Sequence, residues 1–161
     1  MNRPLSLEKK GVRYPKETNI HMEKEKIDPN YMGDGIYKEN IIDHYKNPRN
    51  KGKLENPDIK HRELNPLCGD QIEITIKLND DSIAEIKFDG HGCAISQSSA
   101  SMLTEKVKNL SLEDVNNISK DDVVDMLSIP ISPVRLKCAI LCLDTLKNSI
   151  LIYKKYRQGI R

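Results

Sequence analysis

The chain has 161 residues, a length that fits one domain with a hydrophobic core of its own. Its 26 basic and 24 acidic residues nearly cancel, and a net charge of +2 gives no general attraction to nucleic acid or to a membrane surface. No apolar run approaches the ~18 residues of a membrane span, and no secretory signal is apparent. Four cysteines in such a chain indicate metal binding or thiol reactivity rather than disulfides, in a reducing cytoplasm.

Residues 1–35 form a polar leader that mixes Lys, Glu and Pro and ends in Gly33-Asp34-Gly35. Its apolar residues are too sparse to form a buried face, so we expect the segment to be disordered or loosely docked. An unremarkable tail and a partner-binding arm both fit this composition. The folded domain is expected at residues 36–161.

A short helix and a β-hairpin are expected first in this domain. Apolar residues spaced for a helix occupy 36–45, and the breaker cluster at 47–50 ends the segment. Apolar and polar residues then alternate over 72–78, which predicts a strand with one face buried and the other exposed to solvent. Residues 79–81 make a turn, and the alternation resumes on a return strand at 84–88.

Three helices are expected after the hairpin. The first covers 95–109, and the second is a short helix that Ser119 and Asp122 cap and that ends at Leu127. The last begins at Pro133, because Ser132 is a good capping residue and proline suits the first turn. Its expected apolar stripe is formed by Leu136, Ile140, Leu143, Ile150 and Tyr153.

Three cysteines occupy settings typical of metal ligands. Glycines flank Cys68 and Cys93, which lets the backbone approach a metal closely, and Asp70 follows Cys68 by two residues. In extended backbone ahead of the first strand, Cys68 and Asp70 would point the same way, and the hairpin brings Cys93 to the same end of the sheet. Cys138 lies in the second turn of the last helix. Thiolates with one carboxylate suit zinc or an iron–sulfur unit, while buried cysteines packed as small hydrophobes are the alternative.

Four motifs in order carry a resemblance to a known family. They are a segment from Tyr37 to Asn50, Asn65-Pro66-Leu67-Cys68-Gly69-Asp70, Gly92-Cys93-Ala94-Ile95-Ser96 and Arg135-Leu136-Lys137-Cys138. With these motifs the chain resembles the U-type iron–sulfur cluster assembly proteins, namely IscU, SufU and the N-terminal domain of NifU. The resemblance implies an α+β fold of the SufE/NifU-like kind, a small antiparallel sheet of about three strands packed by about five helices.

The same resemblance implies a partly exposed site built from Cys68, Asp70, Cys93 and Cys138. Proteins of this kind accept sulfur as persulfide from a cysteine desulfurase, combine it with iron, hold a [2Fe–2S] cluster transiently and pass it to apo-proteins. The three cysteines are the persulfide-accepting candidates, and Fe²⁺ and Zn²⁺ are the ions expected at these ligands. The implied protein is a scaffold and carrier rather than a turnover enzyme.

The chain departs from each branch of this family. Lys137 stands where IscU-type scaffolds have a histidine, which makes this motif more similar to SufU. The interval from Cys93 to Cys138 (138 − 93 = 45) has the compact length of IscU. Residues 132–135 match the chaperone-recognition loop of IscU only in part, so a dedicated Hsp70 partner is not expected. A zinc-dependent sulfur acceptor that activates a desulfurase and a structural zinc module remain open, whereas the lack of Cys-x-x-Cys disfavours a dithiol redox protein.

Other chemically active residues have two interpretations each. Cys142 lies four residues after Cys138 and is expected in the core rather than at the metal. His91 is either a spare ligand during cluster exchange or a loop residue, and His44 is expected to pack the first helix. Lys137 either assists persulfide arrival or is simply solvated, and His61 has no assigned role.

Overall fold

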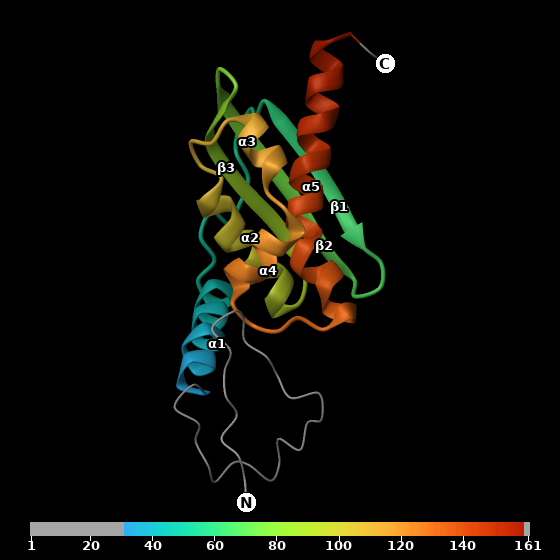
Figure 1. The fold of residues 1–161 in the computed structure, drawn as a ribbon. Helices are drawn as coiled ribbons and strands as arrows, with labels where there is room; N and C mark the ends of the chain where they lie inside the picture. Colours follow the sequence, from blue (N-terminus) through green and yellow to red (C-terminus); the bar gives the residue numbers. More distant parts are fainter. Residues whose placement is uncertain (1–30, 160–161) are drawn as a thin grey trace, which may run out of the picture.

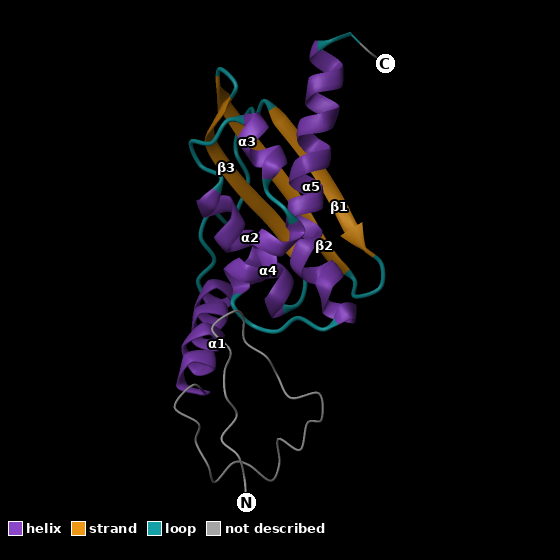
Figure 2. Ribbon diagram, viewed as in Figure 1, coloured by secondary structure: helices purple, strands orange, loops and turns teal. Residues whose placement is uncertain are grey.

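The computed structural model describes residues 31–159, so most of the expected leader lies outside the described residues. Within this range the elements follow in the order α1 (Tyr31–Lys46), β1 (Ile59–Asn65), β2 (Asp70–Asn79), β3 (Ser82–His91), α2 (Ala94–Lys106), α3 (Leu112–Asn117), α4 (Lys120–Leu127) and α5 (Pro133–Arg157). Five helices and one three-stranded sheet over these residues confirm the predicted α+β class (Figures 1 and 2). The boundary of the folded domain stays a prediction.

The sheet has the strand order β1-β2-β3, and both pairs of neighbours are antiparallel. Strands β2 and β3 form the predicted hairpin, with Asn79 opposite Ser82 at its turn. Alternation does not locate β1, because Ile59 and Leu64 are the only apolar residues of this strand. Its pairing with β2 places Asn65 opposite Asp70 at one end of the sheet.

Helices α2 and α5 cover one face of the sheet (Figure 2). Fully buried side chains from both layers form the main core, among them Ile74 of β2, Phe88 of β3, Leu103 of α2 and Leu146 of α5. Burying apolar side chains of this size contributes roughly 1.5–3 kcal/mol each. The core therefore holds α5 firmly along the sheet, and it fixes where the first turns of α5 lie.

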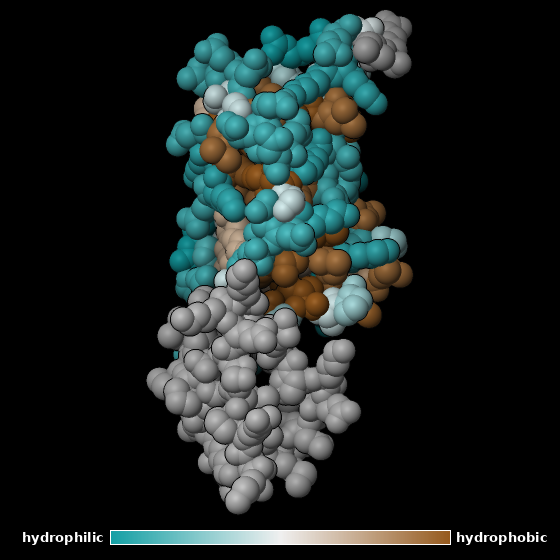
Figure 3. Space-filling model, in the orientation of Figure 1, coloured by the Kyte–Doolittle hydropathy of each residue, from teal (hydrophilic) through white to brown (hydrophobic). Residues whose placement is uncertain are grey.

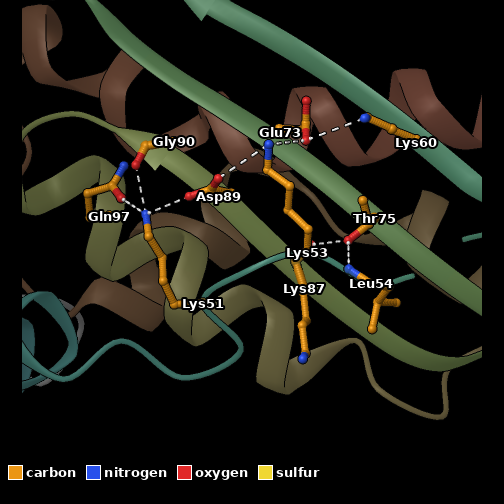
Figure 4. Close-up of polar contacts among 10 residues, drawn as sticks. All are labelled: Lys51, Lys53, Leu54, Lys60, Glu73, Thr75, Lys87, Asp89, Gly90 and Gln97. Carbon is orange, nitrogen blue, oxygen red and sulfur yellow. Dashed lines mark hydrogen bonds and ion pairs between the residues drawn. The ribbon is translucent and has the colours of Figure 1, made fainter. Parts of the chain in front are cut away.

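The opposite face of β2 is covered over the first part of the strand, where the predicted exposure to solvent is wrong, whereas Lys77 further along is exposed as predicted. Glu73 is 9% exposed and Thr75 is 2% exposed. The segment before β1 crosses this face: the Leu54 N–H donates to Thr75 Oγ1 at 3.0 Å, and the Lys53 ammonium lies 3.1 Å from the Glu73 carboxylate (Figure 4). Alternation reports polarity and not exposure, so it cannot reveal a connecting segment that covers polar side chains.

Two predicted helix starts are confirmed by their capping contacts. Ser119 and Asp122 form a reciprocal capping box at the start of α4. The Ser132 side chain accepts a hydrogen bond from the Arg135 N–H, and Pro133 is the first residue of α5. These local contacts place the start of α5, and with it Cys138, relative to the end of the sheet.

Two helix boundaries differ from the prediction, and one helix, α3, was not predicted. Helix α1 begins at Tyr31 rather than at residue 36, so it runs through the glycines that were expected to end the leader. Helix α2 ends at Lys106, three residues early, and α3 is too short to show a periodic pattern. Among the residues described, no helix has the length and apolar character needed to cross a membrane.

Candidate metal centre

The ligand candidates gather at one end of the sheet, where the β1–β2 loop, the end of β3 and the start of α5 lie together (Figure 1). The loop is tight: Asn65 and Asp70 form the last pair of the ladder, and the Gly69 N–H donates to the Asn65 carbonyl at 2.8 Å. Gly69 has a φ of 71°, a left-handed conformation that glycine adopts without a steric penalty. The loop presents Cys68 as an exposed thiol.

The predicted route by which Cys68 meets Asp70 is wrong, although the two side chains do come together. Strand β2 begins at Asp70, and Cys68 lies in the turn before it rather than in extended backbone. The strand period of two therefore does not apply to this pair. The turn itself folds the thiol back toward the carboxylate.

Cys138 reaches the same place from the second turn of α5. It is fully buried, and its Sγ belongs with Cys68 Sγ and an Asp70 oxygen to a group of ligand atoms that all lie within 4.8 Å of one another. Two of the three predicted cysteine ligands and the predicted carboxylate therefore converge.

Cys93 adjoins this group without being part of it. It is the N-cap residue of α2, and its backbone N–H donates to Asp70 Oδ1 at 2.9 Å. The preceding Gly92 is needed for this approach, because a Cβ there would lie 2.6 Å from Asp70 Oδ1. The backbone of Cys93 thus helps to hold the carboxylate, while its thiol lies near Cys138, whose pKa it influences.

The electrostatics of the centre depend on whether its thiols are ionised. Burial first, and then hydrogen bonds with Asp70 and Cys68, raise the pKa of the Cys138 thiol well above its usual range. The Arg135 guanidinium lies beside Cys93 and Cys138, and the charge of Cys93 raises the pKa of that arginine. Metal binding at this centre must therefore displace protons, which makes it dependent on pH.

The predicted structural roles of Cys142 and His44 agree with their surroundings. Cys142 is 1% exposed in the main core, and burial raises its pKa to about 12. His44 is buried, and its Nδ1 lies 2.8 Å from Ser101 Oγ, which joins α1 to α2. Neither side chain belongs to the group of converging ligand atoms.

The remaining candidates lie outside the converging group. His91 and Lys137 are exposed, and neither belongs to it. His61 Nε2 lies 3.1 Å from Glu63 Oε1 on β1, so this histidine contributes to a surface pair. The alternatives for His91 and Lys137 therefore stay open.

Two polar residues of the centre were not singled out from the sequence. Asn65 donates from Nδ2 to Asp70 Oδ2 at 3.4 Å and to Cys138 Sγ at 3.7 Å. Ser96 Oγ is buried, and it lies, like Asp70 Oδ1, within 3.0 Å of where a Cβ on Gly92 would be. Both residues stand in the quoted motifs, but only the tertiary contacts distinguish them from ordinary loop residues.

The donor set fits a zinc ion or an iron–sulfur unit. Two sulfur atoms and a carboxylate oxygen converge, and a third cysteine is adjacent, which is a soft donor set with one harder oxygen. Ser96 Oγ has no hydrogen-bond partner among the described residues, and an unpartnered buried hydroxyl costs about 1–3 kcal/mol. Such an orphaned group beside Asp70 is typical of a site whose full set of contacts includes a bound species.

Fold and site together define an α+β domain in which cysteine and aspartate side chains that fit a metal ion converge at one end of a small sheet. The sequence profile of the family described as "NifU-like N terminal domain" matches residues 36–159. The chain belongs to this family, as its motifs predicted.

Relatives and solved structures agree with this assignment. The chain is 40% identical over 134 residues to "Zinc-dependent sulfurtransferase SufU" of Bacillus subtilis (strain 168), covering 73% of this chain and 90% of the relative. It is 39% identical over 127 residues to "Iron-sulfur cluster assembly scaffold protein IscU" of Escherichia coli (strain K12), covering 76% and 98%. A solved structure from Fervidobacterium islandicum AW-1, described as "Putative iron-sulfur cluster assembly scaffold protein for SUF system", is similar with a TM-score of 0.63 and 27% identity, covering 72% of this chain and 97% of that one.

Proposed function

We propose that this chain is an iron–sulfur cluster assembly scaffold. It accepts sulfur from a cysteine desulfurase, binds iron, holds a [2Fe–2S] cluster transiently and transfers it to apo-proteins. The observation that carries the proposal is the convergence of Cys68, Asp70 and Cys138 within 4.8 Å at the loop end of the sheet, with Cys93 beside them as the fourth proposed ligand. Membership of the family and the name of the Escherichia coli relative support it.

Sulfur arrival requires a thiolate that a partner can reach. Cys68 is exposed and Cys93 is half-buried, whereas Cys138 is buried, so exposure supports Cys68 as the first acceptor. Its thiolate attacks the terminal sulfur of the desulfurase persulfide, a new S–S bond forms, and the desulfurase cysteine leaves as a thiolate. Two equivalents of a one-electron reductant, such as a reduced ferredoxin, then supply the two electrons that release the transferred sulfur as sulfide and return Cys68 to a thiolate.

The end of the sheet that carries the proposed ligands, called the ligand end below, is bordered by apolar surface. This surface supports docking of a protein partner. Leu64, Leu67 and Val134 are exposed although they are large and apolar, and each lies close in sequence to a proposed ligand. Apolar patches are visible at this end of the molecule in Figure 3. Exposed patches of this kind are typical of protein interaction sites, and a cysteine desulfurase must dock here to deliver sulfur.

Asp70 supports a transient rather than a permanent hold on the cluster. A carboxylate oxygen binds iron of a cluster less firmly than a thiolate does. Both oxygens of Asp70 already accept hydrogen bonds, from the Cys93 N–H at 2.9 Å and from Asn65 Nδ2 at 3.4 Å. These contacts orient the carboxylate, but its oxygen remains the weakest of the four proposed ligands, so this corner of the site is the one that opens during transfer.

A zinc-dependent sulfur acceptor is the second candidate, and the 40% identity to the Bacillus subtilis relative favours it. In this function the same four residues hold zinc, and the chain activates a desulfurase without building a cluster. The chain would then have a sulfur-transfer activity, whereas the scaffold has no turnover chemistry of its own. Both candidates need reduced thiols, which fits a cytoplasmic location.

Anaerobic reconstitution of the full chain with Fe²⁺, L-cysteine, a cysteine desulfurase and a reductant separates these candidates. A [2Fe–2S] absorption that passes to an added apo-ferredoxin is the expected result. Zinc that is retained without a cluster, while desulfurase turnover rises, identifies the sulfur acceptor. Zinc whose removal unfolds the domain, without either activity, identifies a structural module. Cys142→Ala is the matched control, because this thiol lies in the core.

A further inference from the structure

Asn65 connects the ligand candidates, yet the proposed sulfur chemistry gives it no part. It is the last residue of β1, it lies opposite Asp70 in the ladder, and it is 5% exposed. A buried side-chain amide normally has hydrogen-bond partners. Those of Asn65 all belong to the ligand end of the sheet.

Three side-chain contacts tie Asn65 to three parts of the centre. Its Nδ2 donates to Asp70 Oδ2 at 3.4 Å and to Cys138 Sγ at 3.7 Å. Its Oδ1 accepts from the Leu67 N–H at 3.3 Å, which orders the loop that carries Cys68. Each bond is long and therefore weak, but together they relate the carboxylate, the α5 thiol and the loop thiol through one side chain.

We propose that Asn65 is a positioning residue of the metal centre, which holds Asp70 and Cys138 in the relative placement that lets both bind one metal. The inference rests on the metal-binding part of the proposed function and is the same for zinc and for iron. The Cys93 N–H fixes Asp70 Oδ1 at 2.9 Å, so with Asn65 the carboxylate is held at both oxygens. Partners that orient a ligand in this way tune metal affinity although they never touch the metal.

The amide suits this role better than its close substitutes. The side-chain amide of Asn65 is neutral. It can therefore donate hydrogen bonds to a carboxylate and a thiolate without placing a positive charge beside a bound metal ion. A carboxylate in its place would repel Asp70, which is 1% exposed and poorly screened. A leucine has the same branching and the same number of side-chain heavy atoms but neither donors nor an acceptor, so it removes all three contacts; because it is also larger, the smaller variant Asn65→Ser serves as the second test.

Titration with Co²⁺ tests the proposal, because the visible absorption of Co²⁺ reports the number and type of its ligands. In the full-length Asn65→Leu variant, Co²⁺ affinity measured by chelator competition is expected to fall about 10–100-fold. The ligand-field bands should change in shape, and the melting temperature of the metal-free protein should stay near that of the wild type. Asn148→Leu is the matched control: its amide donates to Glu63 Oε1 at 2.6 Å on the surface, and its removal should leave affinity and spectrum unchanged.

Two results would overturn the role of Asn65. One is wild-type affinity and spectrum in Asn65→Leu and in a second variant, Asn65→Ser. The other is a fall in the melting temperature of both metal-free variants, or their failure to fold, because Asn65 would then support the fold and not the metal. A wild-type chain that binds Co²⁺ but assembles no cluster contradicts the scaffold function and leaves this test intact, whereas a wild-type chain that binds no metal overturns both.

Discussion

Cys138 and Cys142 lie one turn apart on the same side of α5, but their surroundings differ: Cys138 lies at the ligand end of the sheet and Cys142 lies in the core behind it. Cys138 faces Cys68, Asp70 and the amide of Asn65. Cys142 packs in the main core, where burial alone raises its pKa to about 12. Position on a helix face therefore does not decide whether a cysteine becomes a ligand; the groups that the fold places opposite it do.

The two regions also differ in how well their polar groups are satisfied. The core is apolar and closely packed, whereas the ligand end buries Asn65, Asp70 and Ser96 and leaves Ser96 Oγ without a partner among the described residues. It also brings the backbone of Gly92 against Asp70, where a Cβ would lie 2.6 Å from Asp70 Oδ1. Local conflicts of this kind are expected at functional sites, since a site is selected for what it binds rather than for stability.

The largest difference between the two regions should appear in a pair of serine variants. Cys138→Ser is expected to abolish stable cluster assembly, because a hydroxyl is a far poorer ligand for iron than a thiolate. Cys142→Ser should assemble clusters normally but lose roughly 1–3 kcal/mol of unfolding free energy, because it places a polar hydroxyl in the apolar core. Cluster absorption and urea denaturation measure the two effects. Equal loss of cluster in both variants would contradict the assignment of Cys142 to the core.

Replacing the proposed weak ligand should lengthen the lifetime of the cluster. Asp70→Ala removes the oxygen ligand, so a [2Fe–2S] unit held by the three thiolates should transfer several-fold more slowly to apo-ferredoxin. Zinc affinity should instead fall, since zinc prefers four filled positions. Transfer kinetics followed by circular dichroism, together with zinc competition, check both outcomes. Faster transfer from the mutant would mean that Asp70 retains the cluster rather than loosening it.

A smaller effect is expected from a larger side chain at Gly92, where the ligand end of the sheet meets the core. In Gly92→Ala the new Cβ would lie 2.6 Å from Asp70 Oδ1, so the carboxylate must shift. Overpacking of this kind costs about 1–3 kcal/mol, and metal affinity should fall while all four ligands are retained. Calorimetric metal titration gives the affinity. Gly52→Ala is a useful control for stability, since its Cβ would meet nothing closer than 3.9 Å, although its φ of 124° adds strain.

The smallest effect should follow deletion of residues 1–30. The sequence predicts that this segment has no apolar face to bury, so its removal should leave melting temperature and metal content within error of the full chain. Differential scanning calorimetry and metal analysis on both forms give the comparison. A fall of several degrees would show that the leader docks onto the domain.

Local signals predicted the elements that local chemistry specifies. The β2–β3 hairpin follows from alternation around a turn at residues 79–81, and the starts of α4 and α5 follow from Ser119 and Ser132. Strand β1 was not located, because its pairing partner and not its own pattern makes it a strand. The covered face of β2 was missed for a related reason: the segment that buries Glu73 comes from outside the hairpin.

For the candidate site, the sequence by itself determined the identity and order of the proposed ligands, since thiol and carboxylate chemistry is carried by residue type within short motifs. Tertiary structure alone decided the rest. The turn at Gly69, and not the strand period, brings Cys68 to Asp70, and the packing of α5 on the sheet brings Cys138 from 68 positions along the chain (138 − 70 = 68). The role of Asn65 was hidden for the same reason, because two of its partners come from other elements and sequence spacing cannot report a contact between elements.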